Sequence, residues 1–231
     1  MGGLSTLVKA WKTPDMRKKI IFTLLMLVVF RIGSNIPVPG IDREILSQTF
    51  ADGGNGLIDL FNLFSGGAFA NMTIFALSIT PYITASIIFQ LLTIAIPRLE
   101  AVAKEGLEGR KKIARWTRYL TVVLALIQAI GVTIGMFRSA LISTNFFSVA
   151  VIVLVLSAGT AFLMWLGEQI NENGIGNGIS LIIFAGIIAR LPSGIHNIWL
   201  SLKDGTISYM TVALFIVFAV LVIIGIIEIQ Q

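Results

Sequence analysis

The sequence contains no cysteine among its 231 residues, and only 13% of its residues are charged. Without cysteine the chain has no disulfide framework, no thiol nucleophile and no cysteine-based metal site. Soluble domains usually contain about 25% charged residues, so the low charge excludes an ordinary soluble protein. Instead, 56% of the residues are hydrophobic and the mean hydropathy is +0.91. The apolar runs lack the strict alternation of a membrane β-barrel. The composition therefore predicts an all-α, polytopic membrane helical bundle.

Ionisable side chains are also scarce at membrane depth, where an ion-coupled carrier needs them. Such carriers bury carboxylates or histidines in the bundle, whereas every Asp and Glu here falls in a predicted loop or at the edge of a predicted span, Glu228 being the nearest case. The only histidine, His196, falls in a polar link. No Ser-His-Asp set, H-E-x-x-H pattern or intramembrane aspartate pair can be assembled. We therefore expect neither an enzyme nor an ion-coupled carrier.

The apolar runs predict six membrane spans, because a helix needs about 20 apolar residues to cross a bilayer. They are residues 20–38, 72–96, 119–137, 147–166, 175–191 and 207–227. The first run has a basic flank but no small-residue cleavage pattern, which indicates an uncleaved span rather than a signal peptide. Residues 1–19 are predicted to be an amphipathic segment at the membrane surface.

Lysine and arginine side chains predict the orientation of these spans. Five precede the first span, seven lie between residues 98 and 118, and four lie in the opposite loops or near the end of the fifth span. This asymmetry places the N-terminus and the basic loop 98–118 in the cytoplasm. Such a loop is usually a topology signal, although it could also attract anionic lipid headgroups or an acidic partner. Arg31 remains inside the first span, and we expect it to extend toward the outer surface; the alternative is a pairing with another helix or chain.

Residues 57–97 are the most unusual stretch of the sequence. The piece 57–64 has an apolar face, which favours a helix on the outer membrane surface; the alternative is re-entry into a cavity, with Gly66-Gly67 as a hinge. In the following span, Ser78, Tyr82, Ser86 and Gln90 recur every four residues and Ile79, Ile83 and Ile87 form a neighbouring stripe. Small polar residues often mediate ordinary helix packing, so periodicity alone favours packing over a pore lining. The GIGNGIS stretch at 174–180 likewise fits a tight cytoplasmic turn.

Taken together, several motifs make the sequence similar to the SecY family, the central subunit of the bacterial protein-conducting channel. The motifs are FRIGSNIPVPGID (30–42), FNLFSGGAF (61–69), ITPYITASIIFQLL (79–92), KEGLEGRKK (104–112), FLMWLGEQI (162–170) and GIGNGISLIIFAGI (174–187). They occur in family order and extend over nearly the whole sequence. The resemblance implies an inverted-repeat channel of two five-helix halves, with a short re-entrant plug helix, that conducts unfolded polypeptides across or sideways into the bacterial cytoplasmic membrane.

The resemblance also assigns candidate site residues. It implies a hydrophobic pore ring that includes Ile79, Ile83, Ile179 and Ile183. It implies an external plug formed by Leu57, Ile58, Asp59, Leu60, Phe61, Asn62, Leu63, Phe64, Ser65, Gly66, Gly67, Ala68 and Phe69. It implies one side of a lateral gate with Thr84, Ser86, Ile87, Gln90 and Gln128. It implies a cytoplasmic partner loop with Lys104, Glu105, Arg110, Lys111 and Lys112.

The resemblance finally implies a domain organisation and a set of partners. Residues 20–191 match the N-terminal five-helix half, and residues 192–231 match an external link and the sixth membrane helix, where the sequence ends although the family continues through four more helices. We therefore expect a fragment of the channel, which needs no bound cofactor. The implied partners are SecE, SecG, the motor ATPase SecA, the ribosome, signal peptides, unfolded polypeptides and membrane lipids. The alternatives are a non-conducting assembly module of the translocon and, with less support, a solute transporter built from inverted repeats.

Overall fold

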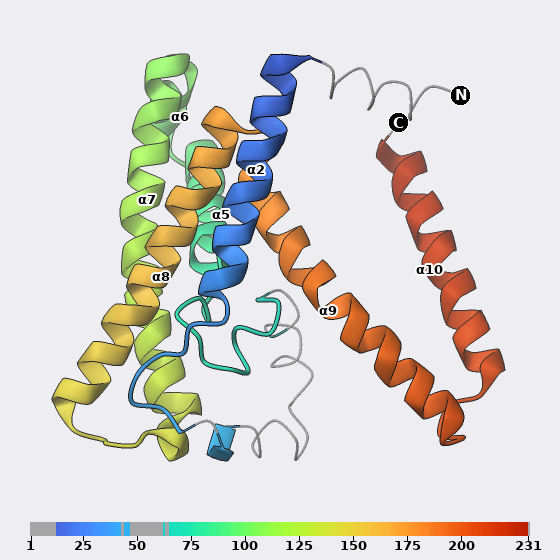
Figure 1. Ribbon diagram of the computed structural model, residues 1–231. Coiled ribbons are helices and arrows are strands. Elements are labelled where there is room, and N and C mark those ends of the chain that lie inside the picture. Colours follow the sequence, from blue (N-terminus) through green and yellow to red (C-terminus); the bar gives the residue numbers. More distant parts are fainter. Residues whose placement is uncertain (1–12, 43, 47–61, 63–64, 231) are drawn as a thin grey trace. The chain divides into compact units, whose positions relative to one another are not determined.

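The computed structural model describes residues 13–42, 44–46, 62 and 65–230, and within these residues it contains helices and no β-strand. The elements, shown in Figure 1, are α2 (Pro14–Gly33), α5 (Thr80–Ala95), α6 (Pro97–Lys104), α7 (Leu107–Ile130), the π-helix η1 (Gly131–Met136), the 3₁₀-helix η2 (Arg138–Ala140), α8 (Phe146–Asn173), α9 (Gly178–Lys203) and α10 (Tyr209–Gln230). The chain forms two compact units, Met1–Ile187 and Ile188–Gln231. The predicted all-α class is confirmed.

Four of the described helices are long and apolar enough to cross a membrane: α7 with η1, α8, α9 and α10. The pair α5 and α6 meets the same test only as one span bent by 103°. Helix α2 is not among them, because four charged residues occupy its first turns and Arg31 its last. The predicted six spans are therefore reached only when α2 and the bent pair are both counted.

The predicted second span, 72–96, is wrong at its beginning. Helix α5 begins at Thr80, and Pro81 occupies its first turn, where the missing N–H of proline costs no hydrogen bond. Before it, Met72 and Ser78 have φ values of 40° and 53°, which a right-handed helix does not allow. Hydrogen bonds to residues 36–38 replace the helical ones: Val38 N donates to the Met72 carbonyl at 2.9 Å, and Ile74 N to the Ile36 carbonyl at 3.0 Å.

The basic stretch 98–118, predicted as a loop, is largely helical. Pro97 begins α6 after the bend, and Gly106, with φ 75°, separates α6 from α7. Charged residues are compatible with these helices because their side chains lie at the surface, where Lys112 reaches Glu105 at 2.9 Å. In Figure 1, α6 and the N-terminus of α7 lie at the same end as the charged N-terminus of α2. The two basic segments of the sequence therefore share one end of this unit.

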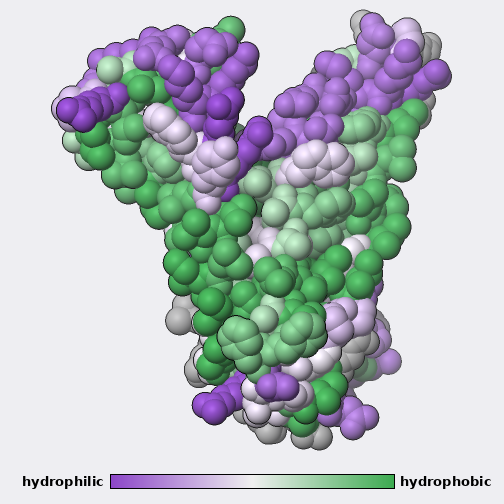
Figure 2. Space-filling view, turned by 90° about the vertical axis from the view of Figure 1, so that its left-hand side faces the viewer, coloured by the Kyte–Doolittle hydropathy of each residue, from purple (hydrophilic) through white to green (hydrophobic). Residues whose placement is uncertain are grey.

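Hydrophobic residues form a broad band across the visible face in Figure 2, and hydrophilic residues gather beyond it at the upper end. This distribution fits a protein whose middle is surrounded by lipid and whose end extends into water. Together with the apolar helices it identifies a multi-pass membrane protein.

Helix α9 continues through Pro192, where the sequence predicts an end. The helix spans Gly178–Lys203 with Pro192 inside it, so the predicted polar link that contains His196 is helical as far as Lys203. Membrane helices tolerate an internal proline when the freed backbone groups find other partners. Near the end of α9, Lys203 Nζ lies 5.7 Å from the centre of the Trp199 ring, which belongs to the preceding turn.

The GIGNGIS stretch forms the turn between α8 and α9. The Asn171 side chain accepts a hydrogen bond from Gly178 N at 2.7 Å, and Asn177 accepts from Ile179 N at 3.0 Å. Thr23 of α2 joins the same turn: its hydroxyl donates to the Lys19 carbonyl at 2.9 Å and accepts from Ile175 N at 3.0 Å. The turn is therefore connected to α2 as well as to its own helices.

Replacing Gly178 with alanine should destabilise the complete protein by about 1–3 kcal/mol, the usual cost of overpacking. An added Cβ would lie 2.1 Å from the Gly167 carbonyl oxygen of α8, a backbone atom that cannot rotate away. Thermal unfolding in detergent measures the effect. Gly194→Ala is the matched control in the same helix, because its Cβ would meet nothing within 4 Å. A Gly178→Ala protein that unfolds at the wild-type temperature would contradict this close packing.

Candidate functional site: segment 65–79 and the isoleucine cluster

The candidate site begins with a compact turn that we call the Asn62 turn, formed by residues 62 and 65–70. Asn62 is buried, and its side-chain oxygen accepts a hydrogen bond from Ala70 N at 3.1 Å. Its backbone carbonyl accepts from Gly67 N at 2.9 Å. The buried Ser65 hydroxyl donates to that same carbonyl and accepts from Phe69 N at 3.0 Å. The side chains of Asn62 and Ser65 therefore find their hydrogen-bond partners within the turn.

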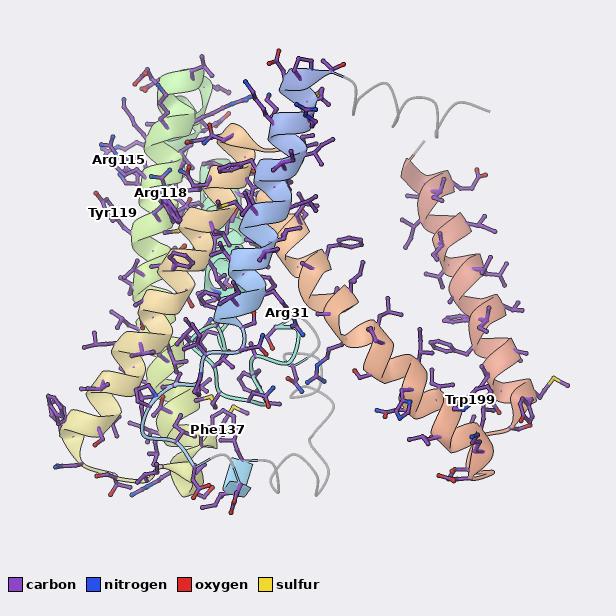
Figure 3. The ribbon with its side chains drawn as sticks, viewed as in Figure 1. Arg31, Arg115, Arg118, Tyr119, Phe137 and Trp199 are labelled. Carbon is purple, nitrogen blue, oxygen red and sulfur yellow. The ribbon has the colours of Figure 1, made fainter. Side chains whose placement is uncertain are left out.

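Gly66 and Gly67, predicted as a hinge, have the positive φ values of 64° and 93°, which glycine adopts without a steric cost. Gly66 also packs directly against α9, since a Cβ added to it would lie 2.8 Å from the Gly186 Cα. Its carbonyl accepts a hydrogen bond from Arg31 Nη1 of α2 at 3.4 Å (Figure 3). Extension toward the surface was the favoured prediction for Arg31, and the structure gives it a partner within the protein, in line with the alternative.

Phe75 fixes the middle of segment 65–79 between two helices. Its ring stacks on Phe30 of α2 at 6.1 Å and on Phe162 of α8 at 5.9 Å between ring centres. Two glycines make room for it: a Cβ on Gly33 would lie 2.1 Å from the Phe75 ring, and one on Gly159 would lie 1.9 Å from the Ile74 carbonyl oxygen. Close backbone approach therefore holds a non-helical segment between α2 and α8.

The four predicted ring residues gather around one hydrophobic cluster, which we call the isoleucine cluster. Its buried members are Phe30, Ala68, Phe75, Ile79, Leu163, Leu166, Ile170 and Ile182. Ile79, at the end of segment 65–79, is 1% exposed, and the half-buried Ile83, Ile179 and Ile183 pack against the cluster. The structure thus brings the four residues together from α5, α9 and the residue that precedes α5.

The predicted lateral-gate residues lie in separate places along α5 and α7. Ser86 and Gln90 line a cavity of about 280 Å³ that also includes Arg110 and Thr117. Gln128 lines a second cavity of about 280 Å³, which it shares with Ser78, Thr80 and Phe69 at the base of the Asn62 turn. The Thr84 hydroxyl donates to the Thr80 carbonyl at 3.1 Å, and Ile87 is exposed.

The predicted partner-loop residues lie on α6, on α7 and in the turn between them. Ion pairs within this hairpin join Lys104 to Glu100, Lys111 to Glu108 and Lys112 to Glu105. Exposed pairs of this kind contribute little stability. Among the described residues, Arg98, Arg110 and Arg115 form no ion pair, so their guanidinium groups remain available to an anionic surface.

Sequence reasoning missed two connections between elements. Arg118 of α7 pairs with Glu168 of α8 at 2.6 Å, and Phe75 fits against Gly33 and Gly159. No local signal identifies either pair, because the partners are far apart in the sequence. The predicted plug residues Leu57, Ile58, Asp59, Leu60, Phe61, Leu63 and Phe64 lie outside the described residues. Within the described part, no three His, Asp or Glu side chains are grouped to hold a metal ion.

Solved structures with the same arrangement are protein-conducting channels. The chain matches "The structure of a protein conducting channel" with a TM-score of 0.64 and 20% identity, over 91% of this chain and 46% of that one. It matches Sec61 in the canine ribosome-channel complex with a TM-score of 0.63 and 20% identity, over 91% and 47%. At this identity the likeness establishes the fold alone, the helical membrane fold that these proteins share.

Sequence comparison then gives the family. A SecY family model matches residues 73–231. The protein translocase subunits SecY of Halalkalibacterium halodurans and Bacillus subtilis (strain 168) are each 48% identical over 98% of this chain and 54% of their own length. The Streptomyces coelicolor subunit is 46% identical over 91% of this chain and 52% of its own length. The chain belongs to the SecY family, as its motifs predict, and it spans about half the length of these relatives.

Proposed function

We propose that this chain forms the N-terminal half of a protein-conducting channel subunit, with residues 57–69 as its plug and the four isoleucines as part of its pore ring. The observation that supports this most is the course of segment 65–79. It turns back among α2, α8 and α9 without forming a helix and ends at Ile79. Non-helical backbone at membrane depth is tolerated only within protein or beside a water-filled cavity. A re-entrant closure satisfies that condition.

The chemistry of the isoleucines fits a passive seal better than a catalytic site. Branched aliphatic side chains can yield around a moving polypeptide, and when the channel is idle a narrow apolar constriction excludes ions by dewetting. A compact segment hinged at two glycines can leave this constriction as one unit. The driving energy then comes from a partner or from the membrane potential, and the rest of the ring comes from the part of the relatives that this chain does not span.

We also propose roles for the helices that surround the pore. Helices α5 and α7 form one wall of a lateral gate, in which Thr84, Ser86, Ile87, Gln90 and Gln128 meet signal peptides and unfolded chains. The shared basic end of α2, α6 and α7 faces the cytoplasm of a bacterium, as the distribution of Lys and Arg supports. The unpaired arginines of the hairpin meet anionic lipids, SecA or the ribosome, and SecE and SecG complete the complex.

A cysteine pair tests whether segment 65–79 must move during transport. In the complete protein we would replace Ala68 and Ile182 with cysteine, because both are buried in the isoleucine cluster, and oxidise the pair to a disulfide. We expect cross-linking in the idle channel and a loss of polypeptide translocation after it. Ala68 paired with the exposed Phe146 of α8 is the control that should not cross-link. Full translocation after complete cross-linking of the first pair would reject the plug, and no translocation in any form of the complete protein would favour an assembly module.

A further inference from the structure

We infer that Arg31 is a positioning residue that holds the hinge of the proposed plug in its seated position. This inference rests on the proposed function, since it assigns to a residue of α2 the task of retaining the plug. Arg31 lies in the last turn of α2, 35 residues from the carbonyl that it reaches, and Figure 3 shows its position beside the non-helical segment.

The first argument is the cost of a charge in this position. The neighbours Phe30 and Ile32 are apolar, and Ile32 is 60% exposed on the helix surface. A guanidinium group at the edge of the apolar region therefore needs an acceptor, from protein or from water. Within the described residues Arg31 forms no ion pair, and the Gly66 carbonyl is the acceptor that it reaches at 3.4 Å.

The second argument compares the hydrogen-bond donors that reach the carbonyls of the Asn62 turn. The carbonyls of Asn62, Ser65 and Gly67 accept hydrogen bonds from within the same stretch, from Gly67 N, Ala68 N and Asn71 N respectively. The Gly66 carbonyl instead accepts from a different element, α2. Among these described carbonyls, that of Gly66 is the one that connects the turn to α2.

The third argument is that a second element, α9, also holds the hinge in place. Gly66 packs on the backbone of Gly186 so closely that no Cβ would fit. This contact limits movement of the peptide unit and keeps its carbonyl directed at α2. A planar guanidinium can keep several N–H groups near a fixed acceptor, whereas the ammonium of lysine is a compact point charge that is strongly hydrated. The site therefore favours arginine over lysine.

Labelling of a single cysteine measures how often the plug leaves its seat. This part of the chain contains no cysteine, so Ala68→Cys, at a position 1% exposed, reports on access by a water-soluble thiol reagent. In the complete protein, with other cysteines replaced, Arg31→Gln should raise the labelling rate about tenfold, because charge-assisted hydrogen bonds are among the stronger ones. Arg31→Lys should raise it less. Arg138→Gln removes a charge from η2 and should leave the rate unchanged.

A second reporter separates positioning from general loosening of the fold. Ile152→Cys, at a position 0% exposed in α8, should keep its slow labelling in Arg31→Gln. An equal rise at both reporters, or no rise at Ala68→Cys, would overturn the inference. The proposed function has its own test: if deletion of residues 57–65 leaves the ion conductance of the idle channel unchanged, the plug is rejected even where the Arg31 result stands.

Discussion

Replacement of Phe75 with alanine is expected to lower the free energy of unfolding of the complete protein by about 3–5 kcal/mol, the range for truncating a buried phenylalanine. Phe75 is 2% exposed and stacks on both Phe30 and Phe162. The glycines at 33 and 159 have no side chains that could fill the space left behind. The resulting cavity would therefore remain, and thermal or denaturant unfolding in detergent would measure its cost.

The control for Phe75 is Phe146→Ala, because Phe146 is 87% exposed at the start of α8 and its loss removes no internal contact. We expect that variant to unfold like the wild type. A Phe75→Ala protein of unchanged stability would show that segment 65–79 does not depend on its aromatic contacts with α2 and α8, and the account of its placement would then be wrong.

The second large effect concerns the seal. Replacing Ile83 and Ile183 together with asparagine in the complete channel should raise the ion conductance of the idle state on the order of tenfold, because polar side chains keep water in a constriction that apolar ones dewet. Both residues are half-buried at the edge of the isoleucine cluster, so the fold loses less packing there than at Ile79. Ion flux into proteoliposomes that contain the purified channel complex measures the change.

Ile94→Asn is the matched control for the seal, since Ile94 also lies on α5 and is 79% exposed. We expect no change in conductance from it. Equal conductance of the wild type and the Ile83/Ile183 double variant, with both reconstituted to the same level, would remove these isoleucines from the pore ring and leave them as ordinary core residues.

Hydropathy predicted the fold where the apolar run is long and uninterrupted. Helix α8 covers the predicted span 147–166, and α10 covers nearly all of 207–227. It failed where tertiary contacts override local preference. Residues 72–79 are as apolar as a membrane-spanning helix. They nevertheless adopt another conformation, in which Met72 and Ser78 have positive φ and hydrogen bonds join the segment to residues 36–38. The helix end predicted at Pro192 was wrong, because a membrane helix can continue through one proline.

The candidate site was predictable in its composition but not in its connections. Gly66 and Gly67 could be identified as a hinge because only glycine readily supplies two successive positive φ values. The isoleucines could be identified only through family motifs, since a stripe of this kind also fits ordinary packing. The partners of Gly66, namely Arg31 and Gly186, are distant in sequence. Geometry of that kind requires the folded chain.

The hydrogen bond from Ile175 N to the Thr23 hydroxyl has a consequence for the synthesis of the protein, because its two residues are 152 positions apart. At about 5–20 residues per second, a ribosome needs roughly 8–30 s to add that length of chain. During this interval α2 has left the ribosome but cannot yet contact the α8–α9 turn. The Thr23 hydroxyl therefore has only its own Lys19 carbonyl as a partner until the α8–α9 turn has been made.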